Sequence, residues 1–399
     1  MNFLDGVRVV DTTQVLAGPV VTMHLGDLGA EVVKVERPDG GDISRSLPPH
    51  VGDTSSQYVA LNRNKHSVAV DLRTDQGREI LHELVGEADV FVENYKRGTP
   101  ERLGIDYETL ASVNPDLVYC SIKGFDSGSI YEDNPAYDMV AQAMGGLMSI
   151  TGQPDGPPAY VGAPVGDLAA AMYAIQSILG ALFHRSFQDA GGEFLEVSML
   201  DAIVAWLGVR LTASGVEGEP YPRLGNRHPN VAPYRVFETA DGYVVVAVVG
   251  ENAWAGLCDA VDRPDLREDP RFATSEARVE HQEALYAELD GVFRARPTEE
   301  WFAVLQDHGV PTGPVRDTIE VLEDPYTEAQ DLIHTFVPPS ADQAVPVVRY
   351  PATVGGKTAD SPRPPPDLGA DTATYLEALG YSAEEIDSLA SSDVVHVPD

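Results

Sequence analysis

Short apolar runs alternate with longer amphipathic stretches through the first third of the chain. Helical patterns begin at Ala17, with a proline in the first turn, and at Thr74, and they end near Gly29 and Gly86. Proline at the start of a helix and glycine at its end are common start and stop signals. Strands separated by helices are typical of a parallel sheet covered by helices. The sequence therefore predicts an α/β fold with a large, open, Rossmann-like parallel-sheet domain, whose strands cover residues 7–11, 31–36, 67–72, 89–94 and 117–122.

The pattern changes in the rest of the chain. A long helix is predicted over about 167–187, a strand over 194–198 and another helix over 200–214. A turn-rich stretch at 215–220 leads to a strand at 243–249 and then to helices rich in Ala, Glu and Arg. This middle section predicts a smaller α+β domain inserted into the larger one. A proline-rich extended segment and two short helices follow, over residues 336–368 and 371–391.

The charge of the chain excludes one class of partner. There are 27 Lys and Arg against 63 Asp and Glu, a net charge of −36, so the phosphates of nucleic acid would meet like charge. Such a surface is typical of halophilic proteins, because about 1 M salt shortens the Debye length to roughly 3 Å and screens the self-repulsion. Residues 1–124 carry 12 basic and 19 acidic groups (net −7), and residues 125–399 carry 15 and 44 (net −29). An anionic ligand is therefore expected to bind the N-terminal part.

Composition also bears on location. Cys120 and Cys258 are the only cysteines, which is typical of a protein kept in a reducing cytoplasm. The N-terminus has neither a basic nor an apolar segment, so no signal peptide is predicted. No apolar run reaches the roughly 18–20 residues that a membrane span needs. We expect a cytoplasmic protein without a membrane partner.

Several common chemistries lack their motifs. The turn at residues 12–19 does not have the G-x-G-x-x-G pattern that dinucleotide binding requires. The histidines lack the spacing of metal ligands, so no metal site is predicted. A G-x-S-x-G nucleophile elbow is also absent from the sequence.

Asp167 is the candidate for covalent chemistry. It follows a loop with Pro164 and Gly166, which permits close approach of a substrate, and it precedes an Ala-rich helical run. At a helix N-terminus the macrodipole favours the ionised carboxylate, which suits a nucleophile. From this segment alone, a plain helix cap is the alternative.

An ordered series of motifs runs nearly end to end. It includes Leu4–Asp11, Ala17–Pro19, Leu28–Arg37, Gly41–Asp42, Asn62–Lys65, Asp89–Asn94, Ala136–Gln142, Thr151–Gly152, Gly166–Asp167, Gly225–Asn226 and His228–Pro229. Together these motifs resemble the class III CoA-transferases, the family of formyl-CoA transferase and carnitine CoA-transferase. The resemblance implies that Asp167 is the catalytic nucleophile. It implies coenzyme A contacts at Leu16, Ala17, Arg37, Arg73, Asn94, Tyr95, Arg102, Leu103, Tyr137 and Met199. The three arginines suit the CoA phosphates, which guanidinium groups bind in bidentate fashion.

The resemblance also implies a domain plan. The large CoA-binding domain would span residues 1–215 and be completed by the returning segment 331–399, with the small domain at 216–330. Two chains would interlock as a homodimer.

The implied reaction moves coenzyme A from an acyl-CoA donor to a carboxylic acid, with CoA thioesters as substrates and no permanently bound cofactor. Asp167 would form an aspartyl anhydride and then an aspartyl-CoA thioester, and N–H groups near Gly145, Gly146 and Gly166 would stabilise the oxyanions. Within the family's range, the favoured pair is succinyl-CoA and a dicarboxylate such as mesaconate.

Two alternatives stay open. One is an α-methylacyl-CoA racemase, although its basic histidine would fall at Tyr137, and a tyrosine is a poor base at neutral pH. The other is a non-catalytic CoA-binding protein. Deuterium exchange at an α-carbon would indicate the racemase, and binding of acyl-CoA without adduct or exchange would indicate the binding protein.

The acidic composition gives a first testable prediction. The thermal unfolding midpoint is expected to rise steeply between dilute buffer and molar KCl, because salt screens repulsion among the carboxylates. Differential scanning calorimetry at several KCl concentrations measures this shift. A midpoint that does not respond to KCl would contradict the halophilic interpretation.

Overall fold

The computed structural model describes residues 2–188, 190–338, 342–356, 358 and 363–398. The chain divides into two compact units. The first unit comprises residues 1–147, 160–217 and 326–399, and the second comprises 148–159 and 218–325. The domain plan implied by the resemblance placed the boundaries at 215/216 and 330/331. It assigned residues 148–159 to the large domain, whereas they cluster with the second unit.

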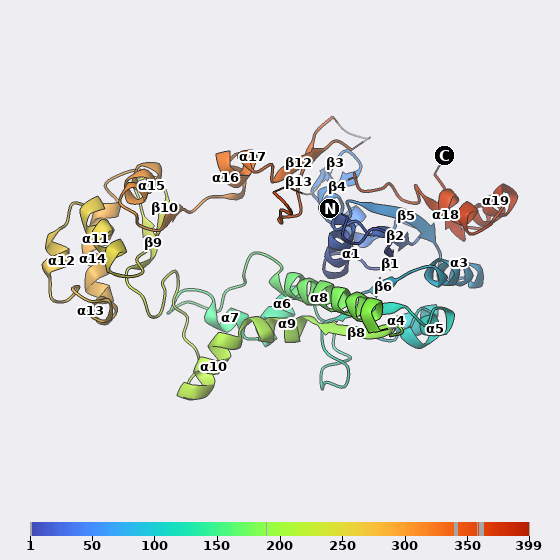
Figure 1. Cartoon of the computed structure of the whole chain (residues 1–399), viewed down its shortest axis with the longest axis horizontal. Coiled ribbons are helices and arrows are strands. Elements are labelled where there is room, and N and C mark those ends of the chain that lie inside the picture. Colours follow the sequence, from blue (N-terminus) through green and yellow to red (C-terminus); the bar gives the residue numbers. More distant parts are fainter. Residues whose placement is uncertain (1, 189, 339–341, 357, 359–362, 399) are drawn as a thin grey trace. The chain divides into compact units, whose positions relative to one another are not determined.

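The first unit is built on a seven-stranded sheet (Figure 1). The strands lie in the order β14-β5-β2-β1-β6-β7-β8 and are parallel except for β14, which runs antiparallel to β5. This confirms the predicted α/β fold with a large parallel sheet. The strands are β1 (Arg8–Asp11), β2 (Glu31–Glu36), β5 (Lys65–Val70), β6 (Val90–Glu93), β7 (Val118–Lys123), β8 (Glu193–Ser198) and β14 (Val395–His396).

The strand order contains a switch point. From β1 the chain proceeds to β2 and β5 on one side, and then crosses to β6, β7 and β8 on the other side. At such a point the loops that follow the two central strands, here β1 and β6, turn in opposite directions and leave a crevice at the carboxyl ends of the strands. The topology therefore makes the loops after Asp11 and Glu93 the candidate location of a binding site.

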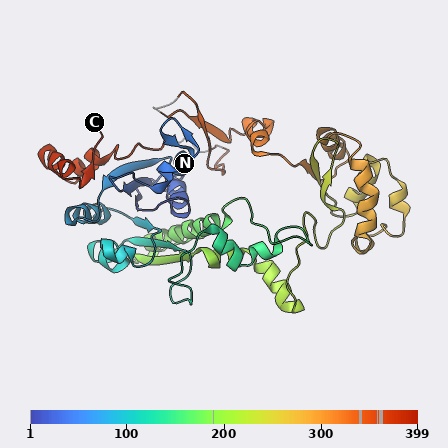
Figure 2. The ribbon, with the colours of Figure 1, turned by 180° about the vertical axis from the view of Figure 1, so that it is seen from behind.

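Helices cover both faces of the sheet (Figures 1 and 2). Four helices, α3 (Asp75–Gly86), α5 (Tyr107–Val113), α18 (Thr372–Ala378) and α19 (Ala383–Ser391), share one apolar core with the inward side chains of the strands. On the other face lie α1 (Ala17–Asp27) and α8 (Val165–Gln188), which pack against each other. Strand side chains alternate between faces. Val10 and Val33 belong to the first core, so Asp11 and Lys34 point to the face that α1 covers.

The helix α8 is long and apolar enough to cross a membrane, as is the bent pair of α9 (Met199–Trp206) and α10 (Gly208–Glu217) taken together. The sequence had predicted no apolar run long enough to span a membrane. In the fold, α8 packs on β7, β8, α1 and α9, and its Ala-rich side is buried. This packing against the sheet accounts for its apolar composition.

Shorter elements complete the first unit. They are η1 (Ile43–Ser46), β3 (His50–Val51), β4 (Thr54–Ser55), α2 (Ser56–Leu61), α4 (Thr99–Leu103), α6 (Asp138–Met144), β12 (Ile333–Phe336) and β13 (Val345–Val348), with α7 (Leu147–Ile150) and α17 (Pro325–Ala329) at the boundaries.

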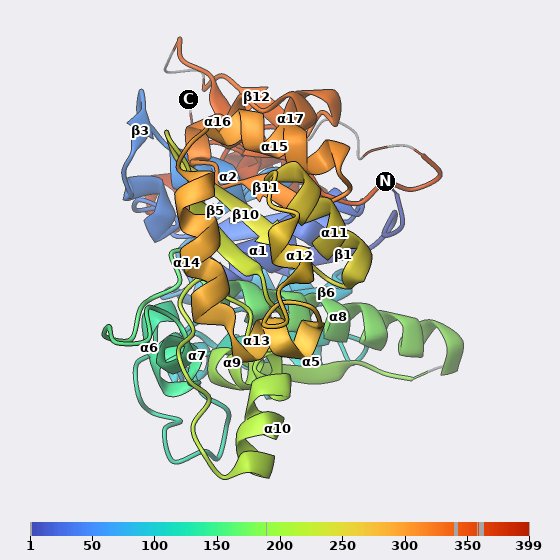
Figure 3. The same ribbon diagram turned by 90° about the vertical axis from the view of Figure 1, so that its left-hand side faces the viewer.

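The second unit has its own core around a three-stranded antiparallel sheet of order β11-β10-β9 (Figure 3). Phe237 stacks on Phe293 at 4.4 Å between ring centroids, and Trp301 packs beside them. Its elements are β9 (Tyr234–Glu238), β10 (Tyr243–Ala247), α11 (Glu251–Ala260), α12 (Asp265–Glu268), α13 (Ser275–Glu280), α14 (Gln282–Phe293), α15 (Thr298–Asp307), β11 (Thr312–Pro314) and α16 (Thr318–Leu322).

Candidate active site

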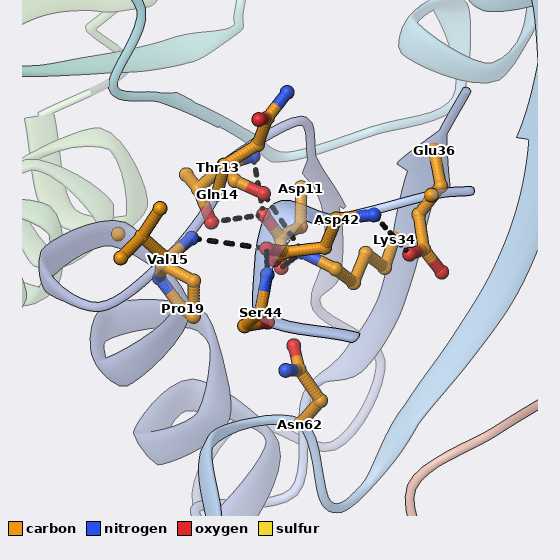
Figure 4. A network of polar contacts seen from close by, with 12 residues as sticks. Asp11, Thr13, Gln14, Val15, Pro19, Lys34, Glu36, Asp42, Ser44 and Asn62 are labelled. Carbon is orange, nitrogen blue, oxygen red and sulfur yellow. Dashed lines mark hydrogen bonds and ion pairs between the residues drawn. The ribbon is translucent and has the colours of Figure 1, made fainter. Parts of the chain in front are cut away.

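The loop between β1 and α1 is fixed by side chains from β2, from the segment after β6 and from the N-cap of η1 (Figure 4). The Asn94 amide, after β6, accepts a hydrogen bond from the Gln14 N–H (2.9 Å) and donates one to the Gln14 carbonyl (2.8 Å). Lys34 Nζ donates to the Thr13 carbonyl (2.8 Å). Val15 has a left-handed backbone with φ of 69°, and its N–H donates to Asp42 Oδ1 (3.1 Å). The loop is therefore rigid at the switch point that the topology singles out.

Beneath this loop lies a cluster of buried charges, Asp11, Lys34, Asp42 and Lys65. Lys34 Nζ lies 2.9 Å from Asp42 Oδ2 and 3.9 Å from Asp11 Oδ2, and Lys65 Nζ lies 3.0 Å from the same Asp11 oxygen. Burial opposes ionisation of Asp11, but the two lysines and two threonine hydroxyls outweigh it and lower the pKa of Asp11 to about 2. For Lys65 burial prevails over the attraction of Asp11 and lowers the pKa to about 8.

Asp167 lies in the first turn of α8, and Ala17, the first residue of α1, lines the same cavity. The backbone N–H of Ala17 favours the ionised form of the Asp167 carboxylate. Asp138 is close by. Its carboxylate accepts hydrogen bonds from the Gly166 N–H (2.6 Å) and from the Gln142 amide (2.8 Å).

The electrostatics of Asp167 differ from the sequence expectation. The helix dipole predicted a carboxylate stabilised in its ionised form. Burial and the neighbouring charge of Asp138 instead raise the pKa of Asp167 to about 6, and the Ala17 N–H only partly offsets them. The expectation was wrong because it considered one helix end and not the desolvation or the second carboxylate.

The proposed oxyanion donors also need correction. The N–H of Gly145 donates to the Ala141 carbonyl, that of Gly146 to the Ala143 carbonyl, and that of Gly166 to Asp138. These N–H groups are therefore engaged within the fold. The backbone N–H that favours the charge on Asp167 belongs instead to Ala17, 150 positions earlier in the chain.

Asp167 lines a cavity of about 530 Å³ within the first unit. A second cavity, of about 260 Å³, lies next to it, because Gln14 and Tyr95 line both. Nine of the ten predicted CoA contacts line these cavities: Leu16, Ala17, Asn94, Tyr95, Tyr137 and Met199 the larger, and Arg37, Arg73, Leu103 and again Tyr95 the smaller.

Arg102 is the predicted contact that lines neither cavity. Its side chain is exposed and donates to Thr99 Oγ1 (2.8 Å). The other two predicted arginines are held in place at the smaller cavity. Arg37 donates to the Gly41 carbonyl through Nε and Nη2 (3.2 Å each), and Arg73, 75% exposed, forms an ion pair with Asp71 (2.8 Å).

The lysines concentrate at this site. Lys34 and Lys65 lie beneath the loop, and Lys96 and Lys123 line the larger cavity. The chain has only five lysines, and the fifth, Lys357, lies outside the described residues. The sequence analysis assigned these lysines no role. A lysine within the apolar run Val32–Val35 was a signal, because a charge buried in a strand requires a partner.

Among the described residues, no group of three His, Cys, Asp or Glu side chains is placed to hold a metal ion. Comparison with known proteins gives the family. Residues 4–372 match CoA-transferase family III. The chain belongs to this family. CoA-transferases use CoA thioesters as substrates, so a cavity beside cationic side chains agrees with the class of ligand.

Several relatives resemble this family III CoA-transferase over most of their length. The succinyl-CoA:mesaconate CoA-transferase of Haloarcula hispanica is 41% identical over 88% of the chain and 90% of the relative. The human succinyl-CoA:glutarate CoA-transferase is 37% identical, over 98% and 90% respectively. The crystal structure of a CAIB/BAIF family protein from Brucella suis superposes with a TM-score of 0.86 at 34% identity, covering 95% of this chain and 99% of that one.

The environment of Asp167 predicts its titration. The side chain is expected to titrate near pH 6, and Asp138→Asn is expected to lower that value, because it removes the neighbouring charge and keeps an oxygen acceptor for the Gly166 N–H. Carboxyl ¹³C NMR of protein labelled at aspartate measures this, with Asp167→Asn assigning the resonance. A titration near the usual aspartate pKa of about 4 in the parent would contradict the prediction.

Proposed function

We propose that this CoA-transferase uses Asp167 as a covalent nucleophile to move coenzyme A from succinyl-CoA to a dicarboxylic acid such as mesaconate. The observation that carries the proposal is the Asp167 carboxylate in the larger cavity, which Ala17, the first residue of α1, also lines. A half-buried carboxylate with a pKa near 6 is largely ionised at pH 7 and only partly hydrated, which suits nucleophilic attack.

The first half of the reaction consists of two exchanges. An Asp167 oxygen attacks the thioester carbonyl carbon of the donor, the carbon–sulfur bond breaks, and an aspartyl–acyl anhydride forms with CoA thiolate. The thiolate then attacks the aspartyl carbonyl carbon, the anhydride bond breaks, and the donor acid leaves as a carboxylate. The product is an aspartyl-CoA thioester, and the acceptor acid takes over CoA by the same steps in reverse.

The Ala17 N–H supports both attacks on the aspartyl carbonyl. Negative charge develops on the oxygen of Asp167 in each tetrahedral intermediate. The N–H of Ala17 favours the ionised carboxylate in the resting enzyme. We propose that it stabilises the same oxygen in the intermediate, where the dipole of α1 favours the same charge. We therefore assign the oxyanion donor to Ala17.

The cavity arrangement supports a CoA site in two parts. The smaller cavity, with Arg37 and Arg73, has the guanidinium groups that suit phosphates, and the larger cavity contains Asp167. Leu16, Ala17, Asn94, Tyr95, Leu103, Tyr137 and Met199 are proposed to line the path of the ligand between these ends. Arg102 stays a prediction from the resemblance, without support from the cavities.

The interlocked homodimer and the cytoplasmic location also stay predictions. Large apolar side chains exposed along α8, α9 and α10 support the packing of a second chain against these helices, since exposed apolar surface marks interaction sites. They are Phe183, Phe187, Trp206, Val209, Leu211 and Val216.

The nucleophile is tested by substitution and mass spectrometry. Asp167→Ala is expected to lower the rate of CoA exchange by about 10⁴-fold or more, because no covalent intermediate can form. Parent enzyme incubated with acyl-CoA should carry a CoA adduct on the peptide that contains Asp167, and the variant should not. Asp75→Ala is the matched control, since it removes an exposed carboxylate from the first turn of α3. Exchange at the parental rate in Asp167→Ala would overturn the proposal.

The acid specificity is tested with matched acceptors. Lys96, Arg97 and Lys123 line the cavity that holds Asp167, and the relatives named above act between succinyl-CoA and a second dicarboxylate. With succinyl-CoA as donor, kcat/KM for mesaconate or glutarate is expected to exceed that for crotonate or butyrate by about tenfold or more, because a cation facing the distal carboxylate is left unpaired by a monocarboxylate. Equal or faster transfer to the monocarboxylates would contradict this specificity.

A further inference from the structure

The strained residue of the active-site loop is Val15. Its φ of 69° lies in the left-handed region, where a β-branched residue is a genuine outlier. Outliers of this kind persist only where the surrounding structure over-determines them, and they cluster at functional sites. Val15 lines the cavity that contains Asp167, so the cause of its conformation bears on the reaction.

Asp42 supports this conformation from below. Its Oδ1 accepts the hydrogen bond of the Val15 N–H (3.1 Å), and its Oδ2 pairs with Lys34 Nζ (2.9 Å). Lys34 in turn holds the Thr13 carbonyl (2.8 Å). Asp42 therefore acts on the loop at two points, directly at Val15 and through Lys34 at Thr13, as Figure 4 shows.

Asp42 is itself held rigidly. Its side chain is 2% exposed, its N–H donates to Glu36 Oε2 (2.9 Å), and its Oδ1 also accepts from the Ser44 N–H (2.8 Å). Glu36 is tied to Arg45 by two hydrogen bonds. Because the carboxylate of Asp42 has little freedom to move, the position of the Val15 N–H is fixed as well.

The position of the Val15 N–H affects Asp167 through the backbone, because Ala17 follows Val15 by two residues. The helix α1 begins at Ala17, the proposed donor to Asp167, and both residues line the larger cavity. The turn at Val15 sets the direction in which the chain enters α1. We propose that Asp42 is a positioning residue of the transfer reaction: it holds Val15 in the left-handed conformation and so aims the Ala17 N–H at the nucleophile. The inference rests on the proposed role of Asp167, although Asp42 itself contacts only the loop and its buried partners.

The test compares two substitutions at Asp42. Asp42→Ala removes the acceptor of the Val15 N–H and is expected to lower kcat by about 10²-fold, the usual effect of losing one oxyanion donor, with a smaller change in KM for the acyl-CoA. Asp42→Asn keeps an oxygen acceptor and is expected to lose less than about tenfold. Asp39→Ala, an exposed neighbour on the same turn, is the matched control. All variants are measured in molar KCl with their unfolding midpoints.

A rescue experiment distinguishes positioning from general stability. Glycine adopts positive φ without steric cost, so Val15→Gly in the Asp42→Ala background should recover part of kcat. Loss of a fixed Ala17 N–H should also move the titration of Asp167 to higher pH in Asp42→Ala, because that hydrogen bond stabilises the ionised form. This readout needs no turnover, so it decides the inference even if the parent neither exchanges CoA nor forms an adduct, which would defeat the proposed function alone.

Three results would overturn the inference. Asp42→Ala with the parental kcat and the parental Asp167 titration is the first. A change confined to KM is the second, because it would assign Asp42 to the binding of CoA in the smaller cavity. The third is a loss in Asp42→Asn of about 10²-fold, since this would make the charge opposite Lys34, and not the acceptor of the Val15 N–H, the essential feature. If Asp42→Ala fails to fold, the Asp42→Asn result decides.

Discussion

The active site depends on buried charges that must satisfy one another. Asp11, Lys34, Asp42 and Lys65 have been removed from water beneath the β1–α1 loop, and an unpaired ion there would be costly. Some of their other hydrogen bonds go to the loop itself, including those with the Thr13 carbonyl and the Val15 N–H. These contacts hold the β1–α1 loop, which has no regular secondary structure, in a single conformation. They thereby also fix the orientation of the first N–H of α1.

The placement of the lysines also has an electrostatic explanation. In a chain of net charge −36, an anionic ligand is repelled by most of the surface. The four described lysines lie in or beneath the cavities, together with Arg37 and Arg73 at the smaller one. Salt screens the long-range repulsion by the acidic surface, while the cationic side chains at the cavities, which carboxylates also line, act at short range.

The sequence predicted the sheet well because its strands are short apolar runs, and a parallel sheet buries such runs on both faces. The strand order was not predictable from those runs, and it is the order that brings the loops after β1 and β6 together.

Asp167 was found from its helix start, but its partners were not, since Ala17 and Asp138 approach it only through the packing of α1 and α6 on α8. The error about its ionisation has the same origin: desolvation and a second carboxylate are properties of the fold. Residues 148–159 were misassigned for a similar reason, because their contacts are with residues far along the chain, as between Gly225 and Gly152.

The two adjoining cavities address one problem of the proposed mechanism, which is how free CoA thiolate is retained. Once the anhydride has formed, CoA thiolate has no covalent bond to the enzyme, and its escape would leave an intermediate open to hydrolysis. A ligand held at its distant end in the smaller cavity keeps the sulfur near Asp167, so the second attack is effectively intramolecular. Binding energy from the non-reacting part of the substrate is then used for the reaction itself. Gln14 and Tyr95 line both cavities, and Asn94 fixes the backbone of Gln14 on both sides. In the proposed mechanism, the loop that orients the oxyanion donor therefore also forms the passage along which the thiolate is retained.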